Sequence, residues 1–388
     1  MSKKQKKRKI CFVITSGIHY SRSKLILFEL KKRKNVDLQI VVAASAILSM
    51  YSDVLALMKK DGFKCNAKIT MVLEGGSPVA MAKTTGIGIT EFTTVFENLS
   101  PDIVVVRGDR YEVLAPVIAA AYLNITIAHI EGGDVTGNID ESVRHAITKL
   151  SHIHFTTNEE SKKRVMRMGE LPGFVYDVGA PELEFVAKNN YRVSNEFINY
   201  LGVGDAVDIN RPYIVVMQHP VTSEHGKNKD HIEETLHAIY DLKIPSIWFW
   251  PNVDAGTDEV SKGIRSFREE KNPSHMRFIK HIPPEEFIGL LKKTACLVGN
   301  SSSGIKECSY LGIPAVNIGS RQNGRMRASN VIDVGYDMKK IKKAIKVQIK
   351  HGVYQPSHMY YKKNTCKKIC DILVSVDTYT QKFFYDGN

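Results

Sequence analysis

Polar and charged residues follow several predicted β-strands, each at the point where its strand ends. Asp109 and Arg110 come after the apolar run DIVVV, Glu131 after ITIAHI, His219 after YIVVMQ and Asn252 after SIWFW. A single residue of this kind is often only a turn residue. Because ligands of open α/β sheets bind beyond the carboxyl ends of the strands, four such ends in one chain predict a shared polar site.

The segment GNSSSGIKE, residues 299–307, places three hydroxyls and a glycine at the start of a predicted helix that continues through KECSYLG. Free backbone N–H groups and the positive end of a helix dipole suit a phosphate, whereas an ordinary N-cap needs only one serine. In GSRQNGR, Arg321 and Arg325 can pair with phosphate oxygens, although loop arginines are often merely solvated. The second half therefore predicts a nucleotide-diphosphate site, with Glu307 set deeper to accept hydrogen bonds from sugar hydroxyls.

Three carboxylates, those of Asp109, Glu131 and Asp140, fall in loops at one expected sheet edge. Against a diphosphate they would repel it, so we expect them around a sugar, where general acid–base chemistry uses carboxylates with separated pKa values. The stretch IDESVRHAITKLSH predicts a helix with Asp140 and Glu141 in its first turn and Arg144 one turn later. Acids also favour helix N-termini for electrostatic reasons, so a solvated helix start is the alternative for Asp140.

No cofactor and no metal are expected. The His, Cys, Asp and Glu residues show no convincing metal-ligand spacing. The loop after the first strand, ITSGIHYS, lacks the G-x-G-x-x-G spacing of a dinucleotide fold. The six cysteines include no C-x-x-C pair, which favours reduced structural thiols and a cytoplasmic location.

The net charge of +13 is compatible with nucleic acid, an acidic membrane surface or an anionic substrate. Six of the nine residues Met1–Lys9 are Lys or Arg, so much of the excess lies in a tail that we expect to be disordered. No aromatic and basic platform for bases accompanies this tail. No apolar run approaches the roughly 20 residues of a membrane span, and none follows the basic N-terminus as in a secretion signal. We therefore expect a small anionic substrate, no nucleic acid and no membrane.

Short β-branched runs alternate with amphipathic stretches from Ile10 onward, which predicts parallel sheets with covering helices. The first strand is expected to run into a loop, with a helix from about Ser23. A polar stretch follows Phe185, and the alternation then restarts with YIVVMQHP. With 388 residues and 43% hydrophobic content, we predict two successive α/β domains with a boundary near residues 186–210.

The motifs RGDRYE, HIEGGDVTGNIDESVRHAITKLSH, MQHPVT, WPNVDAG and GNSSSGIKE closely resemble, in this order, those of the UDP-N-acetylglucosamine 2-epimerase family, over about Ile10–Val334. They look most like the hydrolysing branch, which releases UDP and N-acetylmannosamine for sialic acid synthesis. The resemblance implies two Rossmann-like domains of glycosyltransferase-B type, residues 1–185 and 186–362, facing each other across a cleft. It also implies a helix near Lys363–Lys382, within residues 363–388, that returns to the first domain, and a homodimer or homotetramer.

The resemblance also implies roles for single residues. It places catalytic acids at Asp109, Glu131 and Asp140, an essential histidine at His219, and UDP-contacting positions at Ser21, Arg110, Asn252, Ser301, Ser302, Glu307 and Arg321. To these, the chemistry of the residues adds Arg22, Arg144 and Gly304 as substrate-binding candidates. Loss of UDP builds positive charge at C1 of the sugar, so carboxylates would stabilise that charge and take the C2 proton. His219 would hydrogen-bond or protonate the departing diphosphate, and water would add to a glycal-like intermediate.

Two loops depart from the family pattern, which leaves the sugar open. Where the family's first loop reads T-G-T-R-A-[DE]-Y-G, this chain has Gly17 at the arginine and His19 at the acid. In the second loop, Ala46 stands where a histidine is frequent. Gly17 removes a cation from beside the diphosphate, and Arg22 is the nearest replacement. Lys24 is the weaker candidate, because it points to roughly the opposite side of the helix.

Several functions remain open at this point. The first is a hydrolysing epimerase acting on UDP-N-acetylglucosamine. The second is the same elimination on UDP-2,4-diacetamido-2,4,6-trideoxy-glucose, as in legionaminic acid pathways. The others are a non-hydrolysing 2-epimerase and a glycosyltransferase or catalytically silent UDP-sugar-binding module on the same fold. Three acids together with His219 favour the epimerases, and we expect no fused sugar kinase in a chain that ends at Asn388.

Overall fold

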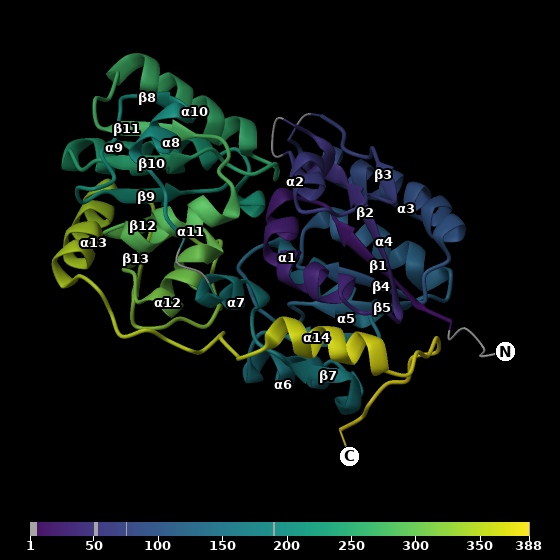
Figure 1. Ribbon diagram of the computed structural model, residues 1–388. Coiled ribbons are helices and arrows are strands. Elements are labelled where there is room, and N and C mark those ends of the chain that lie inside the picture. Colours follow the sequence, from purple (N-terminus) through teal and green to yellow (C-terminus); the bar gives the residue numbers. More distant parts are fainter. Residues whose placement is uncertain (1–5, 50–52, 75, 189–190, 388) are drawn as a thin grey trace.

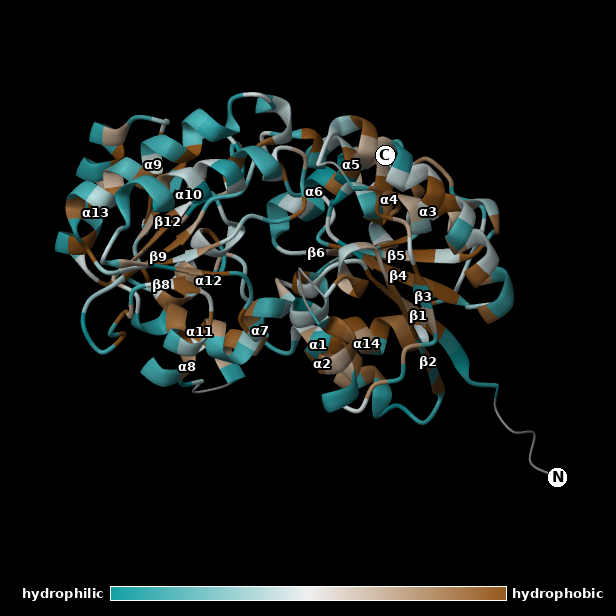
Figure 2. Cartoon of the chain, turned by 90° about the horizontal axis from the view of Figure 1, so that it is seen from above, coloured by the Kyte–Doolittle hydropathy of each residue, from teal (hydrophilic) through white to brown (hydrophobic). Residues whose placement is uncertain are grey.

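The computed structural model describes residues 6–49, 53–74, 76–188 and 191–387. Its chain forms two lobes, each with a central parallel sheet covered by helices on both faces (Figure 1). The strands are the hydrophobic centre of each lobe, and the outer faces of the helices are hydrophilic (Figure 2). No helix in the described parts of the chain is long and apolar enough to cross a membrane.

The first sheet is entirely parallel and has the strand order β3-β2-β1-β4-β5-β6-β7. Its strands are β1 (Arg8–Ile14), β2 (Val36–Ala43), β3 (Ala67–Ile69), β4 (Ile103–Arg107), β5 (Thr126–Ile130), β6 (Ile153–Thr156) and β7 (Val175–Asp177). Every residue of β4, β5 and β6 is buried, because helices cover both faces of the sheet. Short apolar runs of this kind made β4 and β5 visible in the sequence, as DIVVV and ITIAHI, whereas β6 was not predicted.

The second sheet has the order β14-β13-β12-β9-β10-β11-β8, and only β8 runs antiparallel to its neighbour. Its strands are β8 (Val203–Gly204), β9 (Ile214–Met217), β10 (Ser246–Phe249), β11 (Met276–Ile279), β12 (Cys296–Gly299), β13 (Ala315–Ile318) and β14 (Val331–Val334). Strand order reverses between β1 and β4 in one sheet and between β9 and β12 in the other. A crevice for a ligand opens at such a point, beyond the carboxyl ends of the strands.

Helices connect successive strands in both lobes. The first lobe contains α1 (Gly17–Lys31), α2 (Val54–Lys60), α3 (Pro78–Leu99), α4 (Tyr111–Tyr122), α5 (Ile139–Leu150), α6 (Glu159–Arg167) and α7 (Pro181–Lys188), with the short 3-10 helices η1 (Ala44–Ile47) and η2 (Pro172–Phe174). The second contains α8 (Asn195–Tyr200), α9 (Asn228–Leu242), α10 (Thr257–Lys271), α11 (Pro284–Lys293), α12 (Glu307–Leu311) and α13 (Met338–His351), with η3 (Thr222–Glu224) and η4 (Ser302–Gly304).

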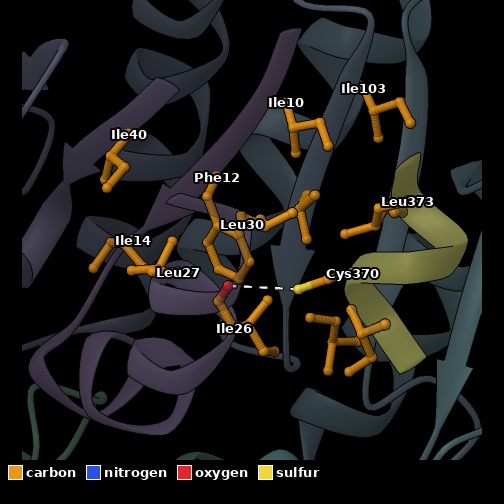
Figure 3. Close-up of a cluster of buried hydrophobic side chains, with 14 of the residues drawn as sticks. Ile10, Phe12, Ile14, Ile26, Leu27, Leu30, Ile40, Ile103, Cys370 and Leu373 are labelled. Carbon is orange, nitrogen blue, oxygen red and sulfur yellow. Dashed lines mark hydrogen bonds between the residues drawn. The ribbon is translucent and has the colours of Figure 1, made fainter. Parts of the chain in front are cut away.

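After α13 the chain crosses back to the first lobe, where it forms α14 (Thr365–Ser375) (Figure 1). This helix lies within the span expected for a returning helix and is shorter than that span. Cys370 and Leu373 of α14 pack with Ile26, Leu30 and the strands of the first sheet in one buried cluster (Figure 3). The Cys370 Sγ lies 3.5 Å from the Ile26 carbonyl oxygen. The last helix is therefore part of the core of the first lobe.

Two local expectations were wrong. The first helix begins at Gly17 rather than near Ser23, because Ser16 caps it by accepting a hydrogen bond from the His19 N–H at 3.3 Å. The expected disordered tail is also too long, since β1 begins at Arg8, whose guanidinium donates to the carbonyl oxygens of Leu373 and Val376 at 3.1 and 2.7 Å. Residues 1–5 of that tail lie outside the described residues.

Candidate active site

A polar cleft lies between the two lobes. Its walls are Arg22, Asp109, Glu131, Asp134, Thr136, Asn138, Asp140 and Arg144 from the first lobe and Ser302, Lys306, Arg321, Gln322 and Arg325 from the second. Seven of the predicted site residues therefore come together here, and they come from strand ends and helix starts of both sheets. A backbone hydrogen bond of 3.0 Å from Gly256 to Gly76 also joins the lobes.

Glu131 lies directly after β5 with a φ of 76°, a left-handed conformation that is rare for a residue with a side chain. Its carboxylate accepts a hydrogen bond from Arg107 Nε at 3.1 Å and one from Lys306 Nζ at 2.6 Å. Burial alone would raise the pKa of Glu131, but Arg107, Lys306 and Arg22 outweigh it and hold that pKa well below its usual range. Glu131 is therefore ionised at neutral pH.

The pKa of Asp140 is shifted in the opposite direction from that of Glu131. It occupies the first turn of α5, where its carboxylate accepts a hydrogen bond from Asn138 Nδ2 at 3.0 Å. Burial and the nearby carboxylate of Asp254 raise its pKa, although Arg321 and Arg110 oppose the rise. One wall of the cleft thus holds a carboxylate with a lowered pKa and one with a raised pKa, which is the separation that acid–base chemistry needs.

Asp109 forms an ion pair with Arg144, whose guanidinium is almost fully buried and also donates to the Asp134 carbonyl oxygen at 2.8 Å. Gly108 before it has a φ of 81°, so this turn can pass close to α1: a Cβ there would lie 3.3 Å from His19 Nε2. Asp109 and Arg144 therefore lie as a pair on the cleft wall. The turn that carries Asp109 passes next to His19, one of the residues that depart from the family pattern.

His219 follows β9 and is fixed by Asn300 after β12. The His219 N–H donates to Asn300 Oδ1 at 2.7 Å, and Asn300 Nδ2 donates to the His219 carbonyl oxygen at 2.8 Å. His219 Nδ1 accepts from the Asn252 N–H at 3.3 Å, so Nε2 carries the ring proton. Burial, followed by Arg321, lowers the pKa of His219 to about 3. The ring is neutral at neutral pH and can donate one hydrogen bond from Nε2.

Arginines from both lobes meet around Asp254, which lies two residues after Asn252. Arg110 Nη1 is 2.9 Å from Asp254 Oδ1, and Arg321 Nη2 is 3.8 Å from Oδ2. Arg110 Nη2, Arg321 Nε and Glu307 Oε2 are buried and have no hydrogen-bond partner among the described residues. Buried polar atoms without partners are costly, and a ligand with anionic oxygens and hydroxyl groups could satisfy the two nitrogens and the carboxylate oxygen.

The serine-rich segment has a different shape from the expected helix start. Residues Ser302–Gly304 form a 3-10 turn, and the α-helix that follows, α12, has only five residues. Ser301 accepts from the Ser303 N–H at 3.3 Å, and Ser302 Oγ accepts from Arg22 Nη2 at 3.2 Å. A five-residue helix has a weak dipole, so the arginines rather than a helix dipole make this side of the cleft attractive to an anion.

A family model described as UDP-N-acetylglucosamine 2-epimerase matches residues 28–374. The chain belongs to this family. It is 33% identical over 374 residues to the UDP-N,N'-diacetylbacillosamine 2-epimerase (hydrolyzing) of Legionella pneumophila, covering 96% of this chain and 97% of that protein. It is 27% identical over 391 residues to the UDP-N-acetylglucosamine 2-epimerase of Neisseria meningitidis, covering 98% of this chain and 100% of that protein.

The fold of this 2-epimerase family member is also similar to a crystal structure of the Neisseria meningitidis UDP-GlcNAc 2-epimerase bound to UDP-GlcNAc. The TM-score is 0.74 at 19% identity, covering 94% of this chain and 99% of the other. The predicted family is therefore confirmed, and so is the predicted architecture of two Rossmann-like domains of glycosyltransferase-B type.

Some predicted binding residues of this epimerase have partners away from the cleft. The Ser21 hydroxyl donates to the Gly17 carbonyl oxygen at 2.9 Å, within α1. Gly304 packs on the second sheet, where a Cβ would lie 3.2 Å from Leu297. The side-chain amide of Asn252 donates to Asp254. The Ser21 hydroxyl and the Asn252 amide thus each use a donor within the chain, and Gly304 can contact a ligand only through its backbone.

Several residues that contact predicted site residues were not singled out as site residues from the sequence, among them Arg107, Glu182, Asp254 and Lys306. Arg107 donates to Glu131 and Glu182, and Lys306 reaches Glu131 from the other lobe. Asp254 and Lys306 stand inside the motifs WPNVDAG and GNSSSGIKE, which could have indicated them. Glu182 carries no comparable signal, because it lies far along the chain from its partners.

His19 and Ala46, two of the residues that depart from the family pattern, lie close together at the carboxyl end of β1. Thr15 Oγ1 is 2.8 Å from His19 Nδ1, and the Ala46 N–H donates to the Thr15 carbonyl oxygen at 3.1 Å. Burial, together with Arg110 and Arg107, lowers the pKa of His19 to about 3. Both positions are buried, and neither carries a charge at neutral pH. Among the described residues, no group of three or more His, Cys, Asp and Glu side chains is placed to hold a metal ion.

Replacing Arg22 by alanine is expected to weaken UDP binding. Arg22 donates to Ser302 at 3.2 Å and to Glu307 at 2.9 Å, so its guanidinium lies at the serine-rich segment. Loss of a hydrogen bond to a charged group costs about 1.5–3 kcal/mol, or roughly 10- to 150-fold in affinity. Lys24→Ala is the control, because Lys24 pairs with Asp61 at 3.0 Å and Glu285 at 2.8 Å. Calorimetric titration with UDP that gives equal affinities for Arg22→Ala and wild type would contradict this role.

Proposed function

We propose that this protein is a hydrolysing UDP-sugar 2-epimerase, which converts a UDP-linked 2-acetamido sugar and water to UDP and the free 2-epimer. The observation that carries the proposal is the pair of cleft carboxylates, Glu131 and Asp140, whose pKa values are shifted in opposite directions. Asp140 also lies near Arg110 and Arg321, each of which has a buried nitrogen that lacks a partner among the described residues. A glycosyltransferase or a silent binding module would not need such a pair of acids.

The diphosphate would bind to Arg110, Arg321, Arg22 and the serine-rich segment. Ligand phosphate oxygens would satisfy the unpartnered nitrogens, and a sugar hydroxyl would donate to Glu307 Oε2. His219 is neutral with its proton on Nε2, so it would donate a hydrogen bond to the leaving diphosphate rather than act as a cation. The Asn252 N–H contributes by fixing the ring of His219.

In the first step, the C1–O bond to the diphosphate breaks and its electron pair leaves with UDP. Ionised Glu131 would stabilise the positive charge that develops at C1. Asp140, which has the raised pKa, would take the proton from C2, forming the C1–C2 double bond of a glycal-like intermediate. Water then adds its oxygen to C1, while C2 regains a proton on the opposite face, which inverts that centre. Asp109 supplies a further carboxylate on the cleft wall.

Two sugars are candidates for the substrate. UDP-N-acetylglucosamine is the first, and 27% identity to the Neisseria meningitidis enzyme of that name supports it. UDP-2,4-diacetamido-2,4,6-trideoxy-glucose, which is UDP-N,N'-diacetylbacillosamine, is the second. It is supported by 33% identity to the Legionella pneumophila protein of that name.

The deciding experiment is incubation of the enzyme with each UDP-sugar in deuterated water, followed by proton NMR. A free 2-epimer with deuterium at C2, together with UDP, is expected for the substrate. Formation of the UDP-linked 2-epimer without any free sugar would replace the proposal by a non-hydrolysing 2-epimerase. Turnover of only the diacetamido sugar would assign the second substrate, and absence of reaction with both would reject the proposed function.

A further inference from the structure

Lys306 has an unusual setting for a lysine. Its side chain is 2% exposed, and its ammonium lies among three carboxylates: Nζ is 2.6 Å from Glu131 Oε1, 3.5 Å from Asp134 Oδ2 and 3.6 Å from Glu182 Oε1. The same nitrogen is 5.6 Å from the centre of the Tyr360 ring. Lysine is almost never buried unless it is paired, so these carboxylates account for its position.

All three carboxylates belong to the first lobe, whereas Lys306 belongs to the second. Glu131 and Asp134 lie in the loop after β5, and Glu182 lies in α7. Lys306 comes directly between η4 and α12, at the carboxyl end of β12. The ammonium therefore crosses the cleft, and it can reach Glu131 only while the two lobes are close together.

The segment that carries Lys306 also carries the serines proposed to hold the diphosphate. Ser302 and Lys306 are joined by a hydrogen bond of 2.9 Å from the Lys306 N–H to the Ser302 carbonyl oxygen. Ser302 Oγ accepts from Arg22 of the first lobe. A diphosphate on this segment would therefore fix the backbone of Lys306 and, through it, the position of the ammonium relative to Glu131.

Glu131 lies in a field of several charges. The groups that face it are Arg107 from β4, Arg22 and His19 from α1, His129 from β5 and Lys306 from the second lobe, while Glu182 and Asp134 share the same cations. Both histidines are buried, with lowered pKa values, and are neutral at neutral pH. Of the three cations that lower the pKa of Glu131, only Lys306 comes from the other lobe.

We propose that Lys306 is a positioning residue for Glu131: its ammonium, delivered across the cleft by the diphosphate-binding segment, holds that carboxylate oriented toward C1. This inference rests on the proposed function. It makes Glu131 fully competent only when the lobes are closed on a bound diphosphate. The enzyme would thereby avoid exposing a prepared carboxylate to water before the substrate is in place.

The test compares Lys306→Met with Lys306→Arg in the full-length enzyme, using the UDP-sugar that the wild type turns over. Met keeps most of the apolar stem and removes the charge, so kcat is expected to fall at least about 10-fold. KM should stay within about threefold of wild type, because the ammonium acts on Glu131 and not on binding of the diphosphate. Lys306→Arg restores the charge and should return kcat toward its wild-type value. UDP affinity, measured by calorimetry, should stay within about threefold.

Lys24→Met is the matched control. Lys24 also makes an ion pair between the lobes, to Glu285 of α11 at 2.8 Å, but it has no contact with Glu131 among those described. Its kcat and KM are expected to match those of wild type. Equal losses of kcat in Lys24→Met and Lys306→Met would mean that any loss of closure lowers turnover, and this would overturn the inference.

An unchanged kcat in Lys306→Met, or a lower kcat accompanied by an equally large rise in KM, would overturn the inference while the proposed function stands. If Lys306→Met does not fold, a near-normal kcat in Lys306→Arg supports the inference, and a 10-fold loss in that charge-preserving variant overturns it. A wild-type enzyme that turns over neither UDP-sugar would reject the proposed function and, with it, the inference.

Discussion

Asp140→Asn is expected to lose roughly 100- to 10,000-fold in turnover and to keep UDP affinity within about threefold. The reason is that Asp140 has a raised pKa and lies in the cleft beside Asn138, so its carboxylate is placed to move a proton. The amide is isosteric and keeps the contact with Asn138. An assay of UDP release from the substrate measures turnover, and calorimetric titration with UDP measures affinity.

The matched control for this variant is Glu141→Gln. Glu141 is the neighbouring acid in the same helical turn, and its carboxylate accepts from the Thr136 N–H at 2.5 Å, a bond that glutamine can keep. It does not line the cleft, so turnover should stay near wild type. Asp109→Asn should behave like Asp140→Asn. Should either aspartate variant lose UDP affinity as severely as activity, the division into a sugar side and a diphosphate side would be wrong.

The strands and the residues at their ends could be predicted from the sequence because both depend on local patterns. Buried parallel strands are short β-branched runs, so β4 and β5 are visible as IVVVR and TIAHI. Since all strands but β8 are parallel, their carboxyl ends meet at one edge of each sheet. That geometry brings Asp109 and Glu131 together although they are far apart along the chain.

The partners of those residues could not be predicted, because they depend on how the lobes face each other. Nothing in the sequence around Lys306 indicates that its ammonium reaches Glu131, or that Glu182 joins the same group. The resulting charges also decide the pKa values. From the sequence, Glu131 and Asp140 are two similar strand-end acids, and only their surroundings give them pKa values shifted in opposite directions.

The start of the first helix was predicted wrongly because it also depends on tertiary contacts. The stretch TSGIHYS contains a glycine and two serines, which favour a loop, yet Ser16 caps a helix at Gly17. The cap satisfies otherwise free N–H groups, and the helix face carrying Ile26, Leu27 and Leu30 is stabilised by packing against β1 and α14. Tertiary packing thus extends the helix into a segment whose local composition opposes it.

Glu131→Gln is expected to lose stability as well as turnover. Its carboxylate pairs with Arg107 at 3.1 Å and Lys306 at 2.6 Å, and removing one charge from a buried group of this kind costs about 3–5 kcal/mol. The folded-state pKa lies below the unfolded value of about 4.3. Glu131 therefore contributes stability above that pH, and the contribution is lost as the pH falls toward the folded-state pKa. The melting temperatures of wild type and variant should differ most at neutral pH and converge on acidification.

Glu170→Gln is the control that distinguishes a loss of stability from a loss of turnover. Glu170 is also a buried acid of the first lobe, contacting His154 at 3.0 Å and Lys149 at 2.7 Å, and these contacts help lower its pKa to about 2 against the effect of burial. It lies outside the cleft lining, so its variant should lose stability with the same dependence on pH and retain turnover at a temperature where it is folded. A Glu131→Gln variant that melts like wild type at neutral pH would show that Arg107 and Lys306 do not hold this carboxylate in solution.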